Sequence, residues 1–136
     1  TFLGQGFSKD EMKELLIIDD QPSRAAALIP QVTNQSRLTF AHGFDQVNYY
    51  LNYSNTEWDL ILLDMDMPLM SGRDITKCFL IGSRIPIIII SLNSFAANWA
   101  WGDLQDSGVE SYYIKITEDD CGALDINKKI LEMLGR

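Results

Sequence analysis

The sequence predicts an α/β fold, a doubly wound parallel sheet of five strands flanked by five helices. Apolar runs alternate with segments of helical pattern along the 136 residues, a length that suits one domain. Three of the runs are apolar throughout instead of alternating with polar residues, which is typical of parallel strands that helices cover on both faces. These runs are Leu15–Ile18, Leu60–Leu63 and Ile87–Ile90.

Helix-start and turn residues separate the first elements. Pro22 beside Ser23 suits the start of a helix, and Pro30 should end it. A brief apolar run then precedes Gly43, and the segment after it has apolar residues at helical spacing. The expected strands here are Leu15–Ile18 and Leu38–Ala41, and the expected helices are Pro22–Ile29 and Phe44–Tyr53.

The second half of the chain continues this alternation. One expected helix has Cys78 on its apolar side, so this cysteine is expected in the core. The next helix is rich in aromatic residues, and because Trp99 and Trp101 lie two residues apart they should not share a helix face. Whether one of them is exposed or both pack stays open. The expected strands are Asp59–Asp64, Pro86–Ser91 and Ser111–Ile116, and the expected helices are Ser71–Leu80, Phe95–Asp106 and Cys121–Leu134.

The composition argues against several classes of protein. The net charge of −8 does not suit a nucleic-acid surface, which would need a basic patch. The two cysteines form no CxxC pair and suit a reducing compartment, so we expect a cytoplasmic location. No apolar stretch is long enough to span a membrane. Residues 1–12 are polar and contain glycine, so we expect a leader or linker there and one domain over residues 13–136.

Polar side chains follow four of the five expected strands. Asp19 and Asp20 follow the first strand, Asp64 ends the third, Ser91 ends the fourth, and Lys115 lies near the end of the fifth. In doubly wound sheets the functional crevice lies at the carboxyl ends of the strands, so these groups should meet at one edge. Polar residues also end strands simply because turns are solvated. These residue types together, however, suit one chemistry.

That chemistry is phosphoryl transfer. A carboxylate can attack phosphorus to form an aspartyl phosphate, and Mg²⁺ prefers one or two carboxylates with waters and phosphate oxygens. A lysine can neutralise one phosphate oxygen, and a hydroxyl can donate to another. A phosphohydrolase of the haloacid dehalogenase type would use both Asp64 and Asp66. Its Asp-x-Asp should lie on the first strand, however, and the only later acidic pair, Asp119-Asp120, follows no further apolar strand.

The sequence resembles the receiver domain of two-component response regulators over nearly its whole length. Each matching motif is weak alone, but their order in a chain with five βα units is specific. The resemblance implies a flavodoxin-like sheet with the strand order 2-1-3-4-5. The matching residues are the acidic pair in IIDD (Asp19-Asp20), the acceptor in LLDMDMP (Asp64) followed by Pro68 and Gly72, the hydroxyl in IIIIS (Ser91) and the lysine in YYIK (Lys115).

The resemblance implies that Asp64 is a phosphate acceptor. It would take a phosphoryl group from a phosphohistidine on a histidine kinase or a histidine phosphotransfer protein. Asp20, Asp64 and the main-chain carbonyl of Asp66 would hold Mg²⁺ (or Mn²⁺), with Asp19 in support through water or as an outer ligand. The protein would then be a switch that phosphorylates and dephosphorylates itself and not a turnover enzyme.

The resemblance also implies a conformational response. Lys115 would pair with the phosphoryl group, and Ser91 would turn towards it and pull its loop. Tyr112, at the position of the switch aromatic, would move with Ser91. The remaining positions near the acceptor, Asp66, Leu92 and Asn93, would modulate the lifetime of the phosphate or access to it.

Two residues depart from the receiver pattern. Ile116 stands where receivers usually have a proline after a cis bond, and because a cis bond before isoleucine costs about 3 kcal/mol we expect a trans bond here. Leu92 stands where a small residue is favoured and could narrow access to Asp64. A pseudo-receiver, a protein-interaction module with a weak or silent site, therefore stays open as the alternative. Homodimer formation and membership of a longer hybrid histidine kinase also stay open, while direct nucleic-acid or membrane contact is not expected.

Overall fold

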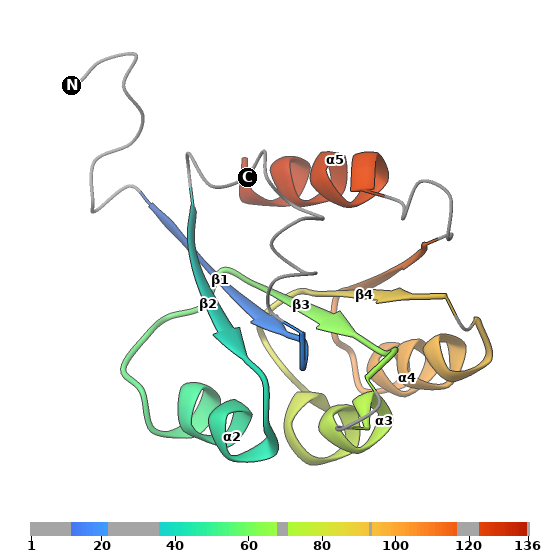
Figure 1. Ribbon diagram of the computed structural model, residues 1–136, viewed down its shortest axis with the longest axis horizontal. Coiled ribbons are helices and arrows are strands. Elements are labelled where there is room, and N and C mark those ends of the chain that lie inside the picture. Colours follow the sequence, from blue (N-terminus) through green and yellow to red (C-terminus); the bar gives the residue numbers. More distant parts are fainter. Residues whose placement is uncertain (1–11, 22–35, 68–70, 93, 117–122, 136) are drawn as a thin grey trace.

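The computed structural model describes residues 12–21, 36–67, 71–92, 94–116 and 123–135. Its centre is a parallel sheet of five strands in the order β2-β1-β3-β4-β5, so the predicted fold class and strand order are confirmed (Figure 1). Each strand begins and ends within two residues of its expected bounds. The strands are β1 (Lys13–Ile18), β2 (Ser36–Ala41), β3 (Leu60–Asp64), β4 (Ile87–Ser91) and β5 (Ser111–Lys115).

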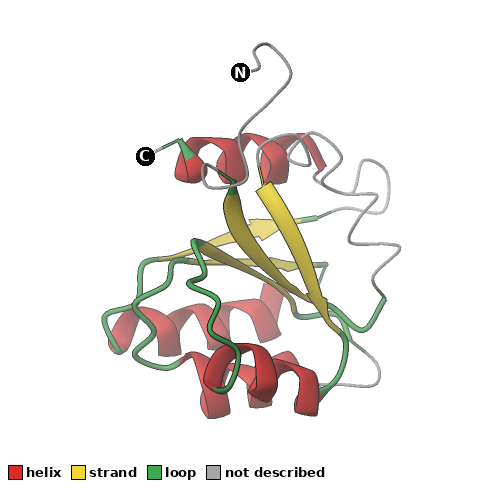
Figure 2. Ribbon diagram, turned by 90° about the vertical axis from the view of Figure 1, so that its left-hand side faces the viewer, coloured by secondary structure: helices red, strands yellow, loops and turns green. Residues whose placement is uncertain are grey.

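Helices cover both faces of the sheet. Three of them, α2, α3 and α4, lie on one face, and α5 lies on the other (Figures 1 and 2). The predicted helix Pro22–Ile29 lies outside the described residues, as does Cys121, the expected start of the last helix. The helices are α2 (Phe44–Asn52), α3 (Gly72–Ile75) with the π-helical segment η2 (Thr76–Leu80) directly after it, α4 (Ser94–Asp106) and α5 (Ala123–Leu134).

The three central strands bury alternate side chains in two separate cores. Leu16 and Ile61 lie in the core beneath α2, α3 and α4, whereas Leu62 and Ile88 lie in the core beneath α5. All four are fully buried. Because an uncompensated charge at such a position would lose its hydration on either face, the strand interiors are closed to ionised side chains. Charged groups of these strands are therefore confined to their ends.

The third predicted helix differs from expectation in its second half. Thr76 is buried, and its hydroxyl donates to the carbonyl of Gly72 at 2.8 Å. The chain then widens into the π-helical segment η2, in which Thr76 and Leu80 face the core while Cys78 is exposed. The prediction that Cys78 is a core residue was therefore wrong. It assumed regular α-helical spacing, and the π-helical turn rotates the residues that follow.

The start of α3 packs closely against the chain that leaves β3. A Cβ atom placed on Gly72 would lie 2.6 Å from Met65 Sδ and 3.1 Å from Met65 Cα. Because Met65 directly follows Asp64, this contact links α3 to the segment that carries the acidic residues. Only glycine leaves room for it.

We expect Gly72→Ala to destabilise the protein by about 1–3 kcal/mol, because Met65 has to move away from the added methyl group. Gly102→Ala is the matched control. Gly102 lies inside α4, and an added Cβ there would have no atom within 4 Å apart from the adjoining backbone of its own helix. Gly102→Ala should therefore stabilise the protein by about 0.5–1 kcal/mol through helix propensity. Urea unfolding of both variants measures the two effects. Equal effects of the two substitutions would contradict the close approach at Gly72.

Candidate functional site

The strand register gathers the predicted site residues at one edge of the sheet. Asp64, the last residue of β3, pairs with Ile90, and Ser91, the last residue of β4, pairs with Lys115 at the end of β5. On the other side of β3, Ile18 of β1 pairs with Leu63, so Asp19 follows β1 beside Asp64. The structure therefore brings together the groups that the sequence places at the strand ends.

The two innermost carboxylates are buried and bonded to the main chain. Asp19 is fully buried and Asp64 is 2% exposed. The amide N–H of Gln21 donates to Asp19 Oδ1 at 2.8 Å, and the amide N–H of Asp66 donates to Asp64 Oδ1 at the same distance. Each carboxylate thus accepts the N–H of the residue two positions downstream. This local hydrogen bond stabilises an ionised carboxylate away from water. Asp20 is half-buried beside them.

The side chain of Asp66 reaches from the segment after β3 to the end of β4. The Ser91 hydroxyl donates to Asp66 Oδ1 at 2.8 Å, and the Leu92 amide N–H donates to Asp66 Oδ2 at 2.5 Å. The sequence predicts a main-chain ligand and a modulating role at Asp66, but it does not predict this bridge. Its formation depends on a side-chain rotamer and on the spacing of two loops.

The two residues that depart from the receiver pattern, Leu92 and Ile116, directly follow β4 and β5. Leu92 has a side chain that is 43% exposed, and it contacts Asp66 through its main-chain N–H. Ile116 is buried under α5 and donates its N–H to the Ser91 carbonyl at 3.0 Å, a bond that proline could not make. All described peptide bonds are trans, as expected for Ile116. Asn93, the third modulating residue, lies outside the described residues.

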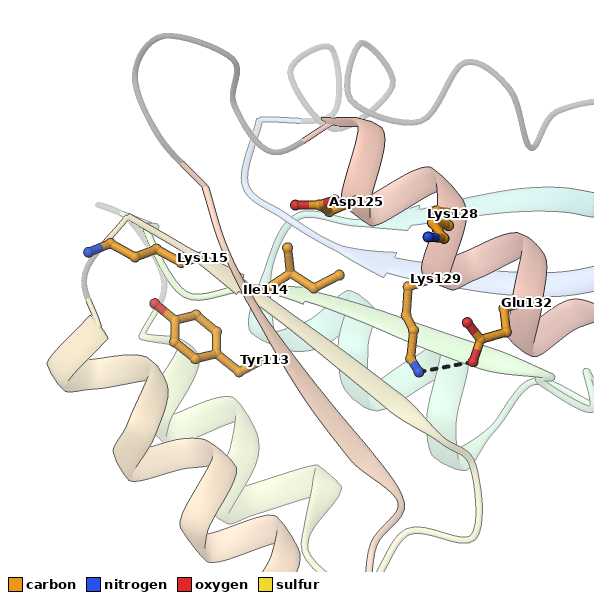
Figure 3. A pocket seen from close by; sticks show the side chains of 7 residues that line it. All are labelled: Tyr113, Ile114, Lys115, Asp125, Lys128, Lys129 and Glu132. Atoms are coloured by element: carbon orange, nitrogen blue, oxygen red, sulfur yellow. Dashed lines mark hydrogen bonds and ion pairs between the residues drawn. The ribbon is translucent and has the colours of Figure 1, made fainter.

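Lys115 stands at the edge of an open groove between β5 and α5. Its side chain is exposed and extends away from α5, beyond the end of β4 (Figure 3). Asp19, Asp64 and Asp66 are not among the residues that line this groove. It has a volume of about 360 Å³ and is lined by Tyr113, Ile114, Lys115, Asp125, Lys128, Lys129 and Glu132.

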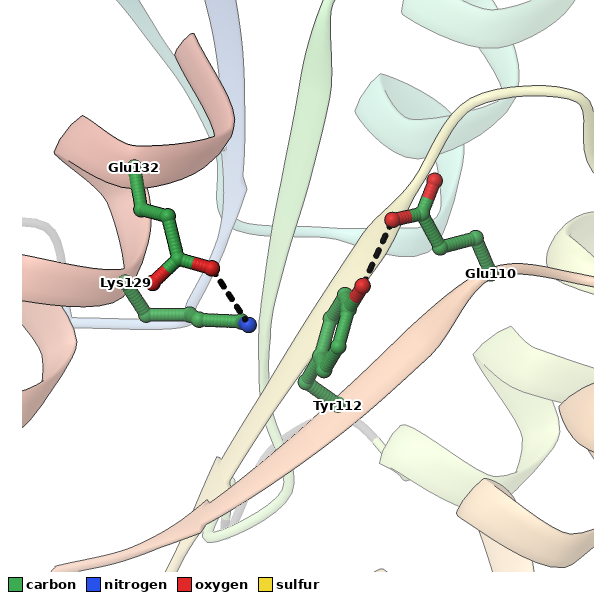
Figure 4. Close-up of polar contacts among 4 residues, drawn as sticks. All are labelled: Glu110, Tyr112, Lys129 and Glu132. Carbon is green, nitrogen blue, oxygen red and sulfur yellow. Dashed lines mark hydrogen bonds and ion pairs between the residues drawn. The ribbon is translucent and has the colours of Figure 1, made fainter. Parts of the chain in front are cut away.

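Tyr112, the expected switch aromatic, contacts α5. Its hydroxyl donates to Glu110 Oε2 at 2.6 Å, and Lys129 Nζ lies 3.8 Å from the centre of its ring. Lys129 also pairs with Glu132 at 3.2 Å (Figure 4). Tyr112 is therefore connected to an ion pair on α5 in this structure, and any inward movement of its ring would break these contacts.

The two tryptophans of α4 differ in environment. Trp101 is half-buried, its Nε1–H donates to the Ser111 carbonyl at 3.1 Å, and its ring packs near Tyr113. Trp99 is 46% exposed, with the Arg73 guanidinium 4.3 Å from the centre of its ring. Trp101 thus holds α4 against β5, while Trp99 is the exposed member of the pair. This resolves the question that their spacing leaves open.

The expected metal ligands have the donor chemistry that Mg²⁺ prefers. In the described part of the chain, no three side chains of His, Cys, Asp or Glu are arranged to hold a metal ion. Mg²⁺ is usually bound by one or two carboxylates together with waters, so it does not need such a group of three. Asp20, Asp64 and the carbonyl of Asp66, the ligands that the resemblance implies, are hard oxygen donors of the kind that this ion prefers.

The comparisons with known proteins identify the fold. No known family pattern matches the sequence, and no curated protein is significantly similar to it. A response regulator receiver protein from Pseudomonas putida, in contrast, superposes with a TM-score of 0.65 at 22% identity, covering 91% of this chain and 96% of that one. The fold is that of a response regulator receiver domain.

Two further solved structures share the receiver fold. Response regulator DrrB of Thermotoga maritima superposes with a TM-score of 0.64 at 16% identity over 92% of this chain, which spans 54% of the length of DrrB. A response regulator of the same organism, in complex with Mg²⁺ and beryllium fluoride, superposes with a TM-score of 0.60 at 20% identity, covering 90% of this chain and 99% of that one.

Among the described helices, none combines the length and apolar character that a membrane crossing requires.

We expect Asp64→Asn to stabilise the protein by on the order of 1 kcal/mol, because it removes a buried negative charge close to other carboxylates. The asparagine oxygen can still accept the N–H of Asp66. Asp59→Asn is the control, since Asp59 accepts the Glu14 N–H at 2.7 Å at the opposite end of β3. Thermal unfolding measures both variants. Stabilisation by Asp59→Asn alone would contradict repulsion between Asp64 and the carboxylates beside it at the carboxyl edge of the sheet, here called the acidic edge.

Proposed function

We propose that this chain is a phosphoacceptor receiver domain of a histidine-to-aspartate phosphorelay. The observation that supports this most directly is the convergence of Asp64 with Asp19, Ser91 and Lys115 at the carboxyl edge of a receiver fold. Receiver domains act as signalling switches and generally not as turnover enzymes. The phosphoryl donor would be a phosphohistidine on a histidine kinase or a histidine phosphotransfer protein, in the cytoplasm.

Each residue at the edge has a role in this proposal. A carboxylate oxygen of Asp64 attacks phosphorus, an O–P bond forms, and the bond from phosphorus to the donor nitrogen breaks. Lys115 neutralises one phosphoryl oxygen, and the Ser91 hydroxyl donates a hydrogen bond to another. Asp20, Asp64 and the carbonyl of Asp66 would hold Mg²⁺, with Asp19 behind them. When bound, the ion would neutralise the charge that gathers on the phosphoryl oxygens.

The solved neighbour that contains Mg²⁺ and beryllium fluoride supports the choice of cofactor and of probe. Beryllium fluoride is similar to a phosphoryl group in shape and charge, and it binds a carboxylate without a transfer step. The acidic residues of this chain offer the same type of ligand. Mg²⁺ or Mn²⁺ is therefore the cofactor that we propose.

A pseudo-receiver is the alternative that a specific observation favours. The Ser91 hydroxyl donates to a carboxylate of the chain itself, that of Asp66. A domain with such an occupied hydroxyl could bind its partner without phosphorylation. The exposed face of α4, with Phe95 and Trp99, would suit a protein partner or a second copy of the chain.

Incubation with Mg²⁺ and acetyl phosphate tests the proposed function. We expect a mass increase of one phosphoryl group that is lost on acid or base treatment, that requires the metal, and that is absent from Asp64→Ala. Asp59→Ala, a carboxylate at the far end of β3, should be phosphorylated as the unchanged protein is. No adduct at saturating donor would favour the pseudo-receiver. Steady release of phosphate from a phosphate ester would favour the Asp-x-Asp phosphohydrolase.

We expect Lys115→Met to slow phosphorylation by acetyl phosphate about a hundredfold, because one cation at the phosphoryl oxygens is lost. Mg²⁺ binding, followed by tryptophan fluorescence, should weaken little or become tighter. Lys128→Met is the matched control, since Lys128 lines the same groove but is carried by α5. Equal rates for the two variants would contradict the role proposed for Lys115.

A further inference from the structure

Asp66 connects the acidic segment after β3 with the end of β4. Its main-chain N–H donates to Asp64 Oδ1, while its own carboxylate accepts the Ser91 hydroxyl at 2.8 Å and the Leu92 amide N–H at 2.5 Å. Short hydrogen bonds to an ionised acceptor are stronger than those between neutral groups. One residue therefore contacts the proposed phosphate acceptor through its backbone and the start of the β4–α4 connection through its side chain.

The two donors that meet at Asp66 form a small anion site. A hydroxyl and the next amide N–H point at the two oxygens of one carboxylate, and Ser91 is fully buried. Donors fixed in this way stabilise an oxyanion because they need no reorganisation when it arrives. A phosphoryl group on Asp64 would place its oxygens close to this site, since Asp64 pairs with Ile90, the residue before Ser91.

We propose that the Asp66 carboxylate is a resident anion that occupies the Ser91 and Leu92 donors before phosphorylation and competes for them with a phosphoryl group on Asp64. This inference rests on the proposed function and gives Asp66 a positioning role in it. The resident carboxylate holds the end of β4 beside the acidic edge without phosphate. The incoming phosphoryl group has to displace it, and it also meets the repulsion of a second negative charge.

If Asp66 has only a structural role in ordering the β4–α4 connection, its removal should change the affinity for a phosphoryl-like anion in the opposite direction. If Asp66 only ordered the connection, its loss would loosen the Ser91 and Leu92 donors and weaken the binding of a phosphoryl-like anion. If Asp66 competes for the donors, its loss frees them, and the anion binds more tightly. The sign of the change therefore distinguishes the two roles.

Titration with beryllofluoride and Mg²⁺, followed by tryptophan fluorescence, measures this sign. We expect Asp66→Asn, which keeps the size of the side chain but removes its charge, to bind beryllofluoride about tenfold more tightly than the unchanged protein, the factor that one charge-assisted hydrogen bond provides. Asp66→Ala should act in the same direction. Asp59→Asn is the control, because Asp59 accepts the main-chain N–H of Glu14 at the opposite end of β3. This substitution should leave the affinity for beryllofluoride unchanged. Unchanged or weaker binding by both Asp66 variants would overturn the proposal.

The amide signal of Leu92 gives a second readout that needs no phosphoryl analogue. In the unchanged protein its proton should resonate downfield and exchange slowly, and in Asp66→Ala it should move upfield and exchange faster. An unmoved signal would overturn the proposal even if the affinity changed. If neither the unchanged protein nor any variant takes up beryllofluoride, the phosphoacceptor function fails, and with it the proposed competition. A Leu92 signal that still moves in Asp66→Ala would then show only that the Asp66–Leu92 hydrogen bond forms. Thermal unfolding of each variant verifies that it is folded.

Discussion

Burial of the central strands on both faces restricts where this chain can carry charge. Side chains of β1, β3 and β4 enter either the core under α2, α3 and α4 or the core under α5, and nearly all of them are excluded from water. An ionised group within these strands would lose its hydration without compensation. Charge is therefore confined to the strand ends, and the parallel register brings the carboxyl ends to one edge.

This confinement creates a cluster of like charges that the main chain has to compensate. Asp19 and Asp64 are both buried, and each accepts an N–H from the residue two positions downstream. Such bonds favour the ionised form of a carboxylate. They do not remove the repulsion between neighbouring carboxylates, which makes this edge a place where a cation or a change of charge has a large effect.

The acidic edge is connected to α4 by a short path. Asp66 bonds to Ser91 and Leu92, and α4 begins two residues after Leu92. Farther along α4, Trp101 donates to the carbonyl of Ser111 at the start of β5. A change of anion at Asp66 would therefore act on a helix that is itself held to the edge strand. This gives a physical route from the acidic residues to the exposed aromatic surface of α4.

The sheet and the identity of the residues at its carboxyl edge could be predicted from the sequence. Continuous apolar runs predict Leu60–Leu63 and Ile87–Ile90 as buried strands whatever the details of packing, and the residues that end such runs must share an edge. Three features could not be predicted in this way: the π-helical turn that exposes Cys78, the exposure of Trp99 in place of Trp101, and the bridge from Asp66 to Ser91. These features depend on helix rotation and side-chain rotamers, which are set by neighbours distant in the chain and leave no periodic pattern in the sequence.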